Sequence, residues 1–355
     1  MALDDLQKAY LWRVIGDFSV ARIRLKERRD EAEDTITSAK VPLAASDGRR
    51  KVDMVAVLSD YRQTNRAINA LTSLESNHEP DGEEGQALTA IILKESRPSL
   101  LIQNGTFKAP SINEWAMLKE HQATLEAIFP AVGRIELSAE NPLNYFGTGF
   151  LVAPDLILTN RHVAQFFIRG DGDLTLRSDL RPQIDYAQEY QVDRSQIAAI
   201  KQAKLVDNYW DLAVLQVEWG EQGPPCLPLC LAGSPPPDLK NGLVATVGYP
   251  ALDRRRSDSI SLQMQIFEGV FDKKRIAPGY TLGRADFQSF GHKVKALQHD
   301  CSTLGGNSGS CIYSLDSKAV IGLHFAGLYL IANYAVPTWE LVNNPTLKAF
   351  GLQFV

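Results

Sequence analysis

The chain has 355 residues, a formal net charge of −5 and a hydrophobic fraction of 45%. This length predicts two domains, or one large domain with an extension, and the composition is sufficient for a sizeable core. So mild a charge argues against nucleic acid or an anionic membrane as a general partner. The first residues include two acids and no basic stretch, and no apolar run approaches the roughly 18 residues that span a bilayer, so we expect no membrane partner.

Residues 1–87 are expected to form a helical N-terminal domain. Apolar residues recur at helical spacing from Leu6 to Phe18 and again from Met54 to Leu74. Charges of both signs alternate over residues 26–31, which favours a solvated helix face over a nucleic-acid patch. A polar, acidic stretch with proline and glycine at residues 75–85 then predicts a linker.

Residues 88–130 are expected to connect this domain to the rest of the chain. A short strand is predicted over residues 98–102, followed by a turn at Asn104 and Gly105. A helix is predicted over residues 113–129.

From residue 131 the pattern changes to short apolar runs separated by turns, which is typical of an all-β barrel or sandwich. The predicted strands are 132–137, 149–153, 156–159, 197–206, 212–217, 243–248, 264–271, 294–298, 311–314 and 320–325. The proline-rich stretch at residues 234–237 is expected to mark the crossing between two barrels, because proline cannot pair in a central strand. A short helix is predicted over residues 337–343, ended by Pro345.

Several polar clusters have a plain structural interpretation. The basic runs at residues 254–256 and 273–275 are expected to be solvated loops, with a site for an acidic substrate as the alternative. The stretch at residues 170–173 is similar to the start of a calcium loop, but leucines follow at the next ligand positions, so we expect a turn. Cys226 and Cys230 have no second cysteine or histidine pair nearby, and we expect no metal and no cofactor.

Three motifs in the β region carry the groups that acyl transfer needs. His162 follows the predicted strand 156–159, Asp211 precedes a Leu-Ala-Val run, and Ser308 lies in a Gly-Gly-Asn-Ser-Gly loop. A serine hydroxyl needs an imidazole to accept its proton, and the imidazole needs a carboxylate to fix its tautomer. Asp207, four residues before Asp211, is the competing carboxylate.

The serine loop also contains candidate donors for a negative tetrahedral oxygen. Such donors are worth on the order of 3 kcal/mol each when they are preorganised. Because glycines at 305 and 306 let the backbone turn tightly, the N–H groups of Gly306 and Ser308 can point at one spot. We therefore expect these two N–H groups to form an oxyanion hole.

With these motifs the chain resembles the trypsin-like (chymotrypsin-fold) serine peptidases, and among them the bacterial glutamyl endopeptidases and related intracellular trypsin-like peptidases. The resemblance covers residues 131 to about 340 and rests on the runs at 147–152, 158–163, 210–214 and 305–310. It implies an all-β domain of two six-stranded barrels with a short C-terminal helix over residues 131–355, preceded by the mostly α-helical N-terminal domain.

The same resemblance implies that the chain is a serine endopeptidase. By motif, His162 is the general base, Asp211 the orienting carboxylate and Ser308 the nucleophile. Asp211 is preferred to Asp207 because the family motif places the acid immediately before Leu-Ala-Val. Trypsin-type zymogens have an aspartate before the nucleophile, but Asn307 is uncharged here. Activation by a new N-terminus is therefore not expected, and we interpret the N-terminal domain as a regulatory or docking module for a protein partner.

The resemblance also places the specificity pocket. Its expected substrate-binding residues are Ser302, Thr303, His324, Phe325, Ala326 and Gly327. A hydroxyl and an imidazole can both hydrogen-bond a carboxylate or an amide, so we expect cleavage after Glu, with Gln or Asp next. The alternative for His324 is a satisfied core histidine. The backbone of residues 325–327 is expected to pair with the substrate as an added strand.

The expected function is thus a cytoplasmic serine endopeptidase that acts on protein or peptide substrates. The cytoplasmic location follows from only 4 cysteines with no disulfide framework. The resemblance extends to effectors of bacterial defence systems. A protease-like binding or scaffold module with little catalysis is the alternative, against which the intact triad argues. Mixed charge and the acidic linker give little support to a third hypothesis, a nucleic-acid-responsive adaptor.

Overall fold

The computed structural model describes residues 9, 12–15, 18–39, 54–76, 78–111, 114–137, 145–170, 174–177, 179–221, 223–254 and 260–355. The chain divides into two compact units. One unit comprises Met1–Ser96 with Ser261–Gly269, and the other comprises Arg97–Ile260 with Val270–Val355. Residues 171–173 of the expected turn and residues 255–256 of the first basic run lie outside the described residues.

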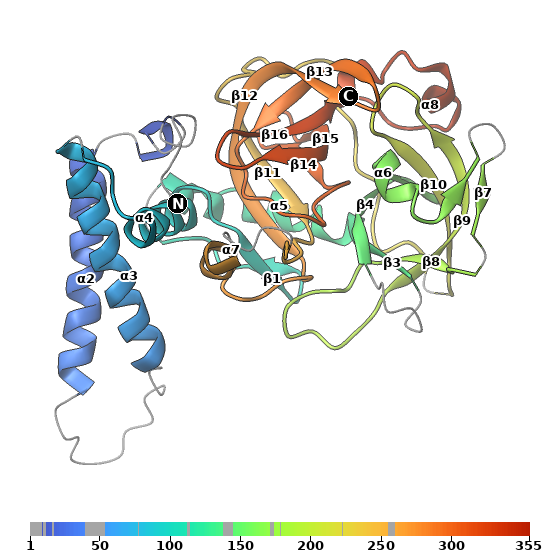
Figure 1. Cartoon of the computed structure of the whole chain (residues 1–355). Coiled ribbons are helices and arrows are strands. Elements are labelled where there is room, and N and C mark those ends of the chain that lie inside the picture. Colours follow the sequence, from blue (N-terminus) through green and yellow to red (C-terminus); the bar gives the residue numbers. More distant parts are fainter. Residues whose placement is uncertain are drawn as a thin grey trace. The chain divides into compact units, whose positions relative to one another are not determined.

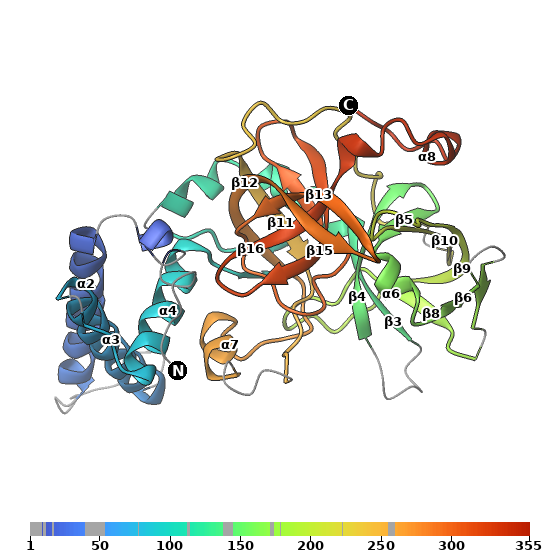
Figure 2. The ribbon, with the colours of Figure 1, turned by 45° about the horizontal axis from the view of Figure 1, so that its top comes forward.

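The first unit is helical, as the apolar spacing predicts. Helices α2 (Phe18–Ala39) and α3 (Met54–Glu75) lie side by side (Figures 1 and 2), and α4 (Gly82–Ser96) follows. Arg28 of α2 bonds to both Asp60 of α3 and Glu95 of α4, the latter at 3.0 Å. This partly buried ion cluster ties the three helices together.

Helix α4 begins inside the stretch that was expected to be a linker. Asp81 Oδ1 accepts the N–H groups of Glu83 and Glu84 at 2.9 and 2.8 Å. A carboxylate at this position satisfies N–H groups that have no partner within the helix. The linker prediction over residues 75–85 is therefore too long at its C-terminal end.

A further helix, α7 (Ile260–Ile266), clusters with this unit from its second residue onward. The strand prediction over residues 264–271 is wrong here. Leu262 and Ile266 are 3% and 7% exposed, whereas Met264 is 43% exposed. Buried positions four residues apart match the spacing of a helix. Packing within the helical unit therefore outweighs the short apolar pattern that had predicted a strand.

The second unit contains two barrels. The first is closed by β10 (Ala213–Trp219), β5 (Leu156–Thr159), β4 (Tyr145–Ala153), β3 (Val132–Leu137), β8 (Pro182–Asp185) and β9 (Ile197–Val206). The second runs in the order β11 (Leu243–Gly248), β14 (Cys311–Ser314), β15 (Ala319–Leu328), β16 (Ala332–Pro337), β13 (His292–His299) and β12 (Arg275–Ser289), and β11 also pairs with β12. Figure 2 shows the first barrel in green and the second mainly in orange and red. The expected fold of two six-stranded barrels is confirmed.

The longest strand, β12, was not predicted, because it begins at a basic run that was expected to be a solvated loop. That expectation is wrong for Lys274 and Arg275, which are 0% and 2% exposed. Lys274 Nζ donates to the carbonyl oxygens of Phe129 and Tyr186 at 2.8 and 2.7 Å. Burial lowers the pKa of Lys274 to about 8. Carbonyl groups distant in sequence thus replace water around the amine, and no local pattern reveals them.

Residues 97–130, the larger part of the 88–130 segment interpreted above as a connection, pack within the second unit. The hairpin of β1 (Leu100–Gln103) and β2 (Thr106–Phe107) extends the second barrel, because β1 pairs with β12. The single helix predicted over residues 113–129 is wrong. Three short helices stand there: η1 (Glu114–Lys119), α5 (Gln122–Glu126) and η2 (Phe129–Ala131).

A short C-terminal helix is present, as predicted, but it does not span the predicted residues 337–343. A short 3₁₀ helix, η4 (Thr338–Glu340), occupies the predicted range, and α8 (Pro345–Ala349) begins where the helix was expected to end. Asn344 Oδ1 accepts N–H groups from Thr346 and Leu347 at 3.0 and 3.2 Å. Proline suits the first helical position because its missing N–H is not needed there. Within the described residues, no helix is both long and apolar enough to cross a membrane.

Candidate active site

Two neighbouring strands of the first barrel bring His162 and Asp211 together. Thr159 at the end of β5 lies opposite Ala213 at the start of β10, and helix α6 (Arg161–Ala164) begins just after β5. His162 Nδ1 lies 2.6 Å from Asp211 Oδ2, and the His162 N–H donates to Asp211 Oδ1 at 3.0 Å. The Asp211 side chain is 5% exposed and that of His162 is 35% exposed. A buried carboxylate therefore holds an imidazole whose other nitrogen remains available.

The competing carboxylate, Asp207, has a different local role. Its Oδ1 accepts the N–H groups of Tyr209 and Trp210 at 2.8 and 2.7 Å. This is the turn geometry in which an aspartate bonds to the backbone just after it. The structure thus directs Asp211, and not Asp207, at the imidazole.

Ser308 lies in the loop between β13 and β14, where it reaches the first barrel. Thr148 of β4 donates its N–H to Ser308 O and its hydroxyl to Gly306 O, both at 2.8 Å. A Cβ on Gly147 would lie 2.7 Å from Val163, which neighbours His162, and 2.9 Å from Ser308 O. Only a glycine fits at position 147, because its missing side chain leaves the space in which the Ser308 loop and helix α6 approach each other.

The residues before Ser308 form a type II turn. The Asn307 N–H donates to Leu304 O at 3.2 Å, and Gly306 has a φ of 85°. A type II turn needs a positive φ at this third residue, which glycine adopts without steric cost. Asn307 is 3% exposed, and its Oδ1 accepts the Leu304 N–H at 3.3 Å. Its uncharged side chain therefore stabilises the turn from within.

The carbonyl groups of this turn fix where its N–H groups point. Gly305 O accepts from the Ala251 N–H at 2.7 Å, and Asn307 O accepts from the Ser310 N–H at 2.9 Å. In a trans peptide the C=O and the following N–H point in opposite directions. The N–H groups of Gly306 and Ser308 therefore point away from these anchors, and no acceptor for either is found among the described residues.

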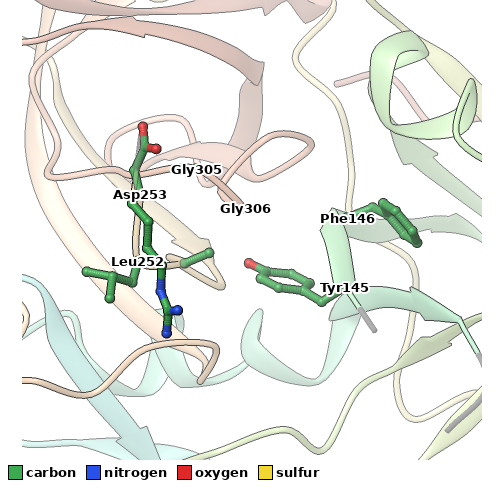
Figure 3. A pocket seen from close by; sticks show the side chains of 8 residues that line it. Tyr145, Phe146, Leu252, Asp253, Gly305 and Gly306 are labelled. Atoms are coloured by element: carbon green, nitrogen blue, oxygen red, sulfur yellow. The ribbon is translucent and has the colours of Figure 1, made fainter. Parts of the chain in front are cut away.

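A cavity of about 310 Å³ lies beside this turn, and Tyr145, Phe146, Gly305 and Gly306 help to line it. Figure 3 shows the Tyr145 hydroxyl pointing toward the turn, whereas the Phe146 side chain points away. A Cβ on Gly306 would lie 1.9 Å from Tyr145 Oη. Burial, aided by the carboxylate of Asp272, raises the pKa of Tyr145 well above its ordinary value. The Tyr145 hydroxyl therefore stays protonated. It packs so close to the backbone of Gly306 that no residue with a side chain fits at position 306.

On the side of the expected specificity pocket, His324 is backed by a second histidine. His299 Nε2 lies 3.1 Å from His324 Nδ1, and the two residues are 0% and 3% exposed. Burial lowers the pKa of His299 to about 3. Burial, followed by the charges of His299 and His162, lowers the pKa of His324 well below its ordinary value. Both imidazoles are therefore neutral at neutral pH.

His299 was missed in the sequence, where its only signal is its place directly after a predicted strand. Asn333 was missed as well, and nothing local singles it out. Its Nδ2 donates to Cys301 O and its Oδ1 accepts from Thr303 Oγ1, both at 2.7 Å. The hydroxyl of Ser302 is occupied differently, since it donates to Arg97 O at 2.6 Å. The structure thus places Thr303 beside Asn333 and directs the Ser302 hydroxyl to the backbone.

The strand expected to pair with substrate has an open edge. Strand β14 pairs with β15 only as far as Leu323, and the Gly309 N–H then bonds to His324 O at 2.9 Å. Beyond that point, Ala326 is half-buried and Gly327 is exposed, while Phe325 remains 7% exposed. An extended peptide could add here as a further strand, next to Ser308 and the pocket.

Comparison with known proteins identifies this arrangement. A family model for the trypsin-like peptidase domain matches residues 147–323, a range that contains His162, Asp211 and Ser308. A probable serine protease of Lysobacter enzymogenes is 30% identical over 317 residues, which are 81% of this chain and 81% of that protein.

Solved structures resemble the chain more distantly. The active form of the Rv3671c protease from M. tuberculosis is 19% identical, covering 70% of this chain and 94% of that one, with a TM-score of 0.45. Deg5 is 21% identical, covering 68% of this chain and 100% of that one, with a TM-score of 0.44.

Proposed function

The chain belongs to the trypsin-like serine peptidases and is a peptide hydrolase, and from this premise we propose that His162, Asp211 and Ser308 are its catalytic triad. The observation that carries the proposal is the 2.6 Å contact of His162 Nδ1 with the buried Asp211 carboxylate, beside the Ser308 loop. With Nδ1 held by Asp211, Nε2 is the nitrogen that can take the Ser308 proton and return it to the leaving amine.

The oxyanion donors in this proposal are the N–H groups of Gly306 and Ser308. Their orientation is supported by the two anchored carbonyl groups, Gly305 O and Asn307 O. Donors that are already oriented need no reorganisation when the negative charge develops, which is why each can lower the barrier substantially. The open edge at residues 325–327 is the proposed pairing site for the substrate backbone.

The proposed specificity depends on the polarity of two side chains. Because Asn333 Nδ2 donates to Cys301 O, its Oδ1 faces Thr303, whose hydroxyl must donate to it. Thr303 then offers substrate an acceptor. A buried donor without a partner is costly, and His299 Nδ1 has no partner among the described residues. This favours the tautomer in which His299 Nε2–H donates to His324 Nδ1.

His324 would then carry its own proton on Nε2 and offer substrate a donor. One donor and one acceptor match the amide of Gln, whereas the carboxylate of Glu is acceptor-only unless a proton is taken up. We therefore propose cleavage after Gln or Glu, with Gln favoured at neutral pH and Glu gaining as the pH falls. Asp is the weakest candidate, because its side chain is one methylene shorter.

Regulation or recruitment through the helical unit is also part of the proposal. A cytoplasmic setting is supported by the cysteines, which are all free thiols, with Cys301 and Cys311 buried. A role as a bacterial defence effector, and a protein partner for the helical unit, remain predictions from the resemblance. A binding module with little catalysis is the alternative function.

A serine-directed phosphonate probe and a peptide library test this function. We expect the wild-type protein to be labelled and Ser308→Ala not to be labelled, with library cleavage dominated by Gln and Glu. Failure of the wild type to label, alone or with candidate activators, would favour the binding module. Cleavage chiefly after Arg, Lys or Phe would contradict the proposed pocket.

The two aspartates provide a matched pair in the same assay. Asp211→Asn is expected to lower kcat by roughly 10⁴-fold, because the imidazole loses the carboxylate that fixes its tautomer. Asp207→Asn, which changes only the turn residue, should retain most of the activity. Equal losses in the two variants would refute the assignment of Asp211.

A further inference from the structure

Three backbone peptide groups form a hydrogen-bonded chain that ends at the oxyanion turn. The Asp272 N–H donates to Pro250 O at 2.9 Å, and the Ala251 N–H donates to Gly305 O at 2.7 Å. Pro250 C=O and Ala251 N–H belong to one peptide group, and Gly305 C=O and Gly306 N–H belong to the next. Each bond polarises the next one along such a chain, so the Gly306 N–H is both oriented and strengthened as a donor.

The turn has an alternative state that this chain of bonds disfavours. Reversal of the Gly305–Gly306 peptide would convert the type II turn into a type I turn, with Gly306 at negative φ. That reversal would point the Gly306 N–H away from the substrate side and would break its carbonyl's bond to Ala251. The Ala251 N–H therefore selects the productive orientation.

The origin of the chain, Asp272, is itself held in an unusual conformation. Its φ is 59°, a left-handed value that β-branched residues rarely adopt. Arg134 Nη1 of β3 donates to Asp272 O at 2.9 Å, which further fixes this backbone position. The Asp272 residue is exposed, so its side chain is not part of a core.

Asp272 is also three residues beyond the point where the chain leaves the helical unit. That unit includes Ser261–Gly269 and so most of α7. Phe267, just after α7, is 2% exposed, and Glu268 forms a 2.8 Å ion pair with Lys94 of α4. A short described segment, Val270–Asp272, therefore links a helix held by the helical unit to the first bond of the chain.

We propose that Val270–Asp272 positions the oxyanion donor of Gly306 through the Pro250–Ala251 peptide, and that the helical unit regulates catalysis by holding or releasing this segment through α7. Asp272 and Ala251 are positioning residues, since they act on the turn and do not touch substrate. The inference rests on the proposed function, because it concerns the oxyanion hole of the same triad.

A matched pair at Asp272 tests the positioning step. Asp272→Val removes the carboxylate and disfavours the left-handed backbone, whereas Asp272→Gly removes the carboxylate and keeps that backbone accessible. We expect Asp272→Val to lower both kcat and the phosphonate labelling rate by at least about tenfold with little change in KM, since loss of a whole oxyanion donor costs about 10²–10³-fold. Asp272→Gly should retain the wild-type rate. Equal rates in the two variants, at equal thermal stability, would overturn the inference.

A second matched pair tests the route through α7. Phe267→Ala loosens the segment that leads to Asp272, and Leu71→Ala removes a similarly buried side chain from α3 of the same unit. A loss of labelling rate confined to Phe267→Ala would support the route, and equal effects or no effect in both would overturn it. These outcomes stay separate from a failure of the proposed catalytic function, which would show as a wild-type protein that does not label at Ser308.

Discussion

At the scale of single residues, the neighbours of a polar group decide its chemistry. Asp207 and Asp211 both lie in the connection between β9 and β10, yet one caps a turn and the other bonds to His162. In the same way, Asn333 Oδ1 accepts the Thr303 hydroxyl, which leaves an acceptor in the proposed pocket, and His299 Nε2 lies 3.1 Å from His324 Nδ1. The proposed preference of the pocket for Gln or Glu thus depends on Asn333 and His299, which are not themselves proposed to contact substrate.

The pH dependence of specificity is the prediction that belongs to this scale. The pKa of His324 is far below its ordinary value in the free protein, so His324 is neutral there. A bound Glu carboxylate favours the protonated imidazole and raises its pKa, so Glu binding takes up a proton. The ratio of kcat/KM for Glu over Gln substrates should therefore rise as the pH falls from about 8 to about 6, by at most about tenfold per pH unit.

Any pH effect on a catalytic step that both substrates share cancels from that ratio. In His324→Gln the ratio should no longer change with pH. The substitution His292→Gln, at an exposed histidine of β13, should leave the pH dependence intact. A ratio that is flat in the wild-type protein would refute the proposed proton uptake.

At the scale of elements, β4 organises the site from the first barrel. Its Thr148 is fully buried and bonds to both Gly306 O and Ser308 O, while Gly147 admits Val163 and the Ser308 carbonyl into close contact. The serine loop comes from the second barrel, so its geometry depends on a strand more than 150 residues earlier in the chain. The turn before Ser308 is thus held by the close contact between the two barrels at β4, here called the barrel seam, and not by the loop alone.

Thr148→Val tests this seam. The substitution keeps the shape and removes the hydroxyl bond to Gly306 O, which should cost about 1 to 3 kcal/mol of stability and lower kcat by about tenfold. Thr338→Val is the matched control, because the Thr338 hydroxyl is also fully buried and bonds to two carbonyl groups, those of Ala232 and Val320. Both variants should lose stability in a thermal melt, but only Thr148→Val should lose activity beyond that effect.

At the scale of the whole molecule, the two units are interleaved along the chain. The helical unit takes Ser261–Gly269 from the middle of the barrel region, so no single cut separates the units. An inserted segment that packs with another unit couples the stability of both, in contrast to two domains joined by one linker. Regulation through the N-terminal helices is therefore compatible with a route inside the chain.

Truncation to residues 97–355 tests this interleaving. The buried side chains of Leu262, Ile266 and Phe267 would lose the helices with which they cluster, and we expect the truncated protein to bind a hydrophobic dye and to aggregate. Changing Leu262 and Ile266 to Gln in the truncated chain should reduce both effects. A truncated protein that is as well behaved as the full chain would contradict the interleaved arrangement.

Much of the β region could be predicted because its information is local. Strands β3, β5, β9, β11 and β14 have the bounds expected from short apolar runs between turn residues. The prediction failed where a distant partner decides the environment. Lys274 is paired with carbonyl groups 145 and 88 residues away, and α7 is helical because of its packing in the helical unit.

The sequence by itself determined the family, the two-barrel fold and the residues proposed for the triad. Each of these depends on short motifs, whose glycines, turn residues and polar groups act within a few positions of one another. Only the tertiary structure decided which way the Thr303 hydroxyl donates, that His299 lies behind His324, and that the Asp272 N–H bonds to Pro250 O. Those features depend on hydrogen bonds and packing between segments that are far apart in the chain. A local sequence pattern does not reveal which distant residues will be partners.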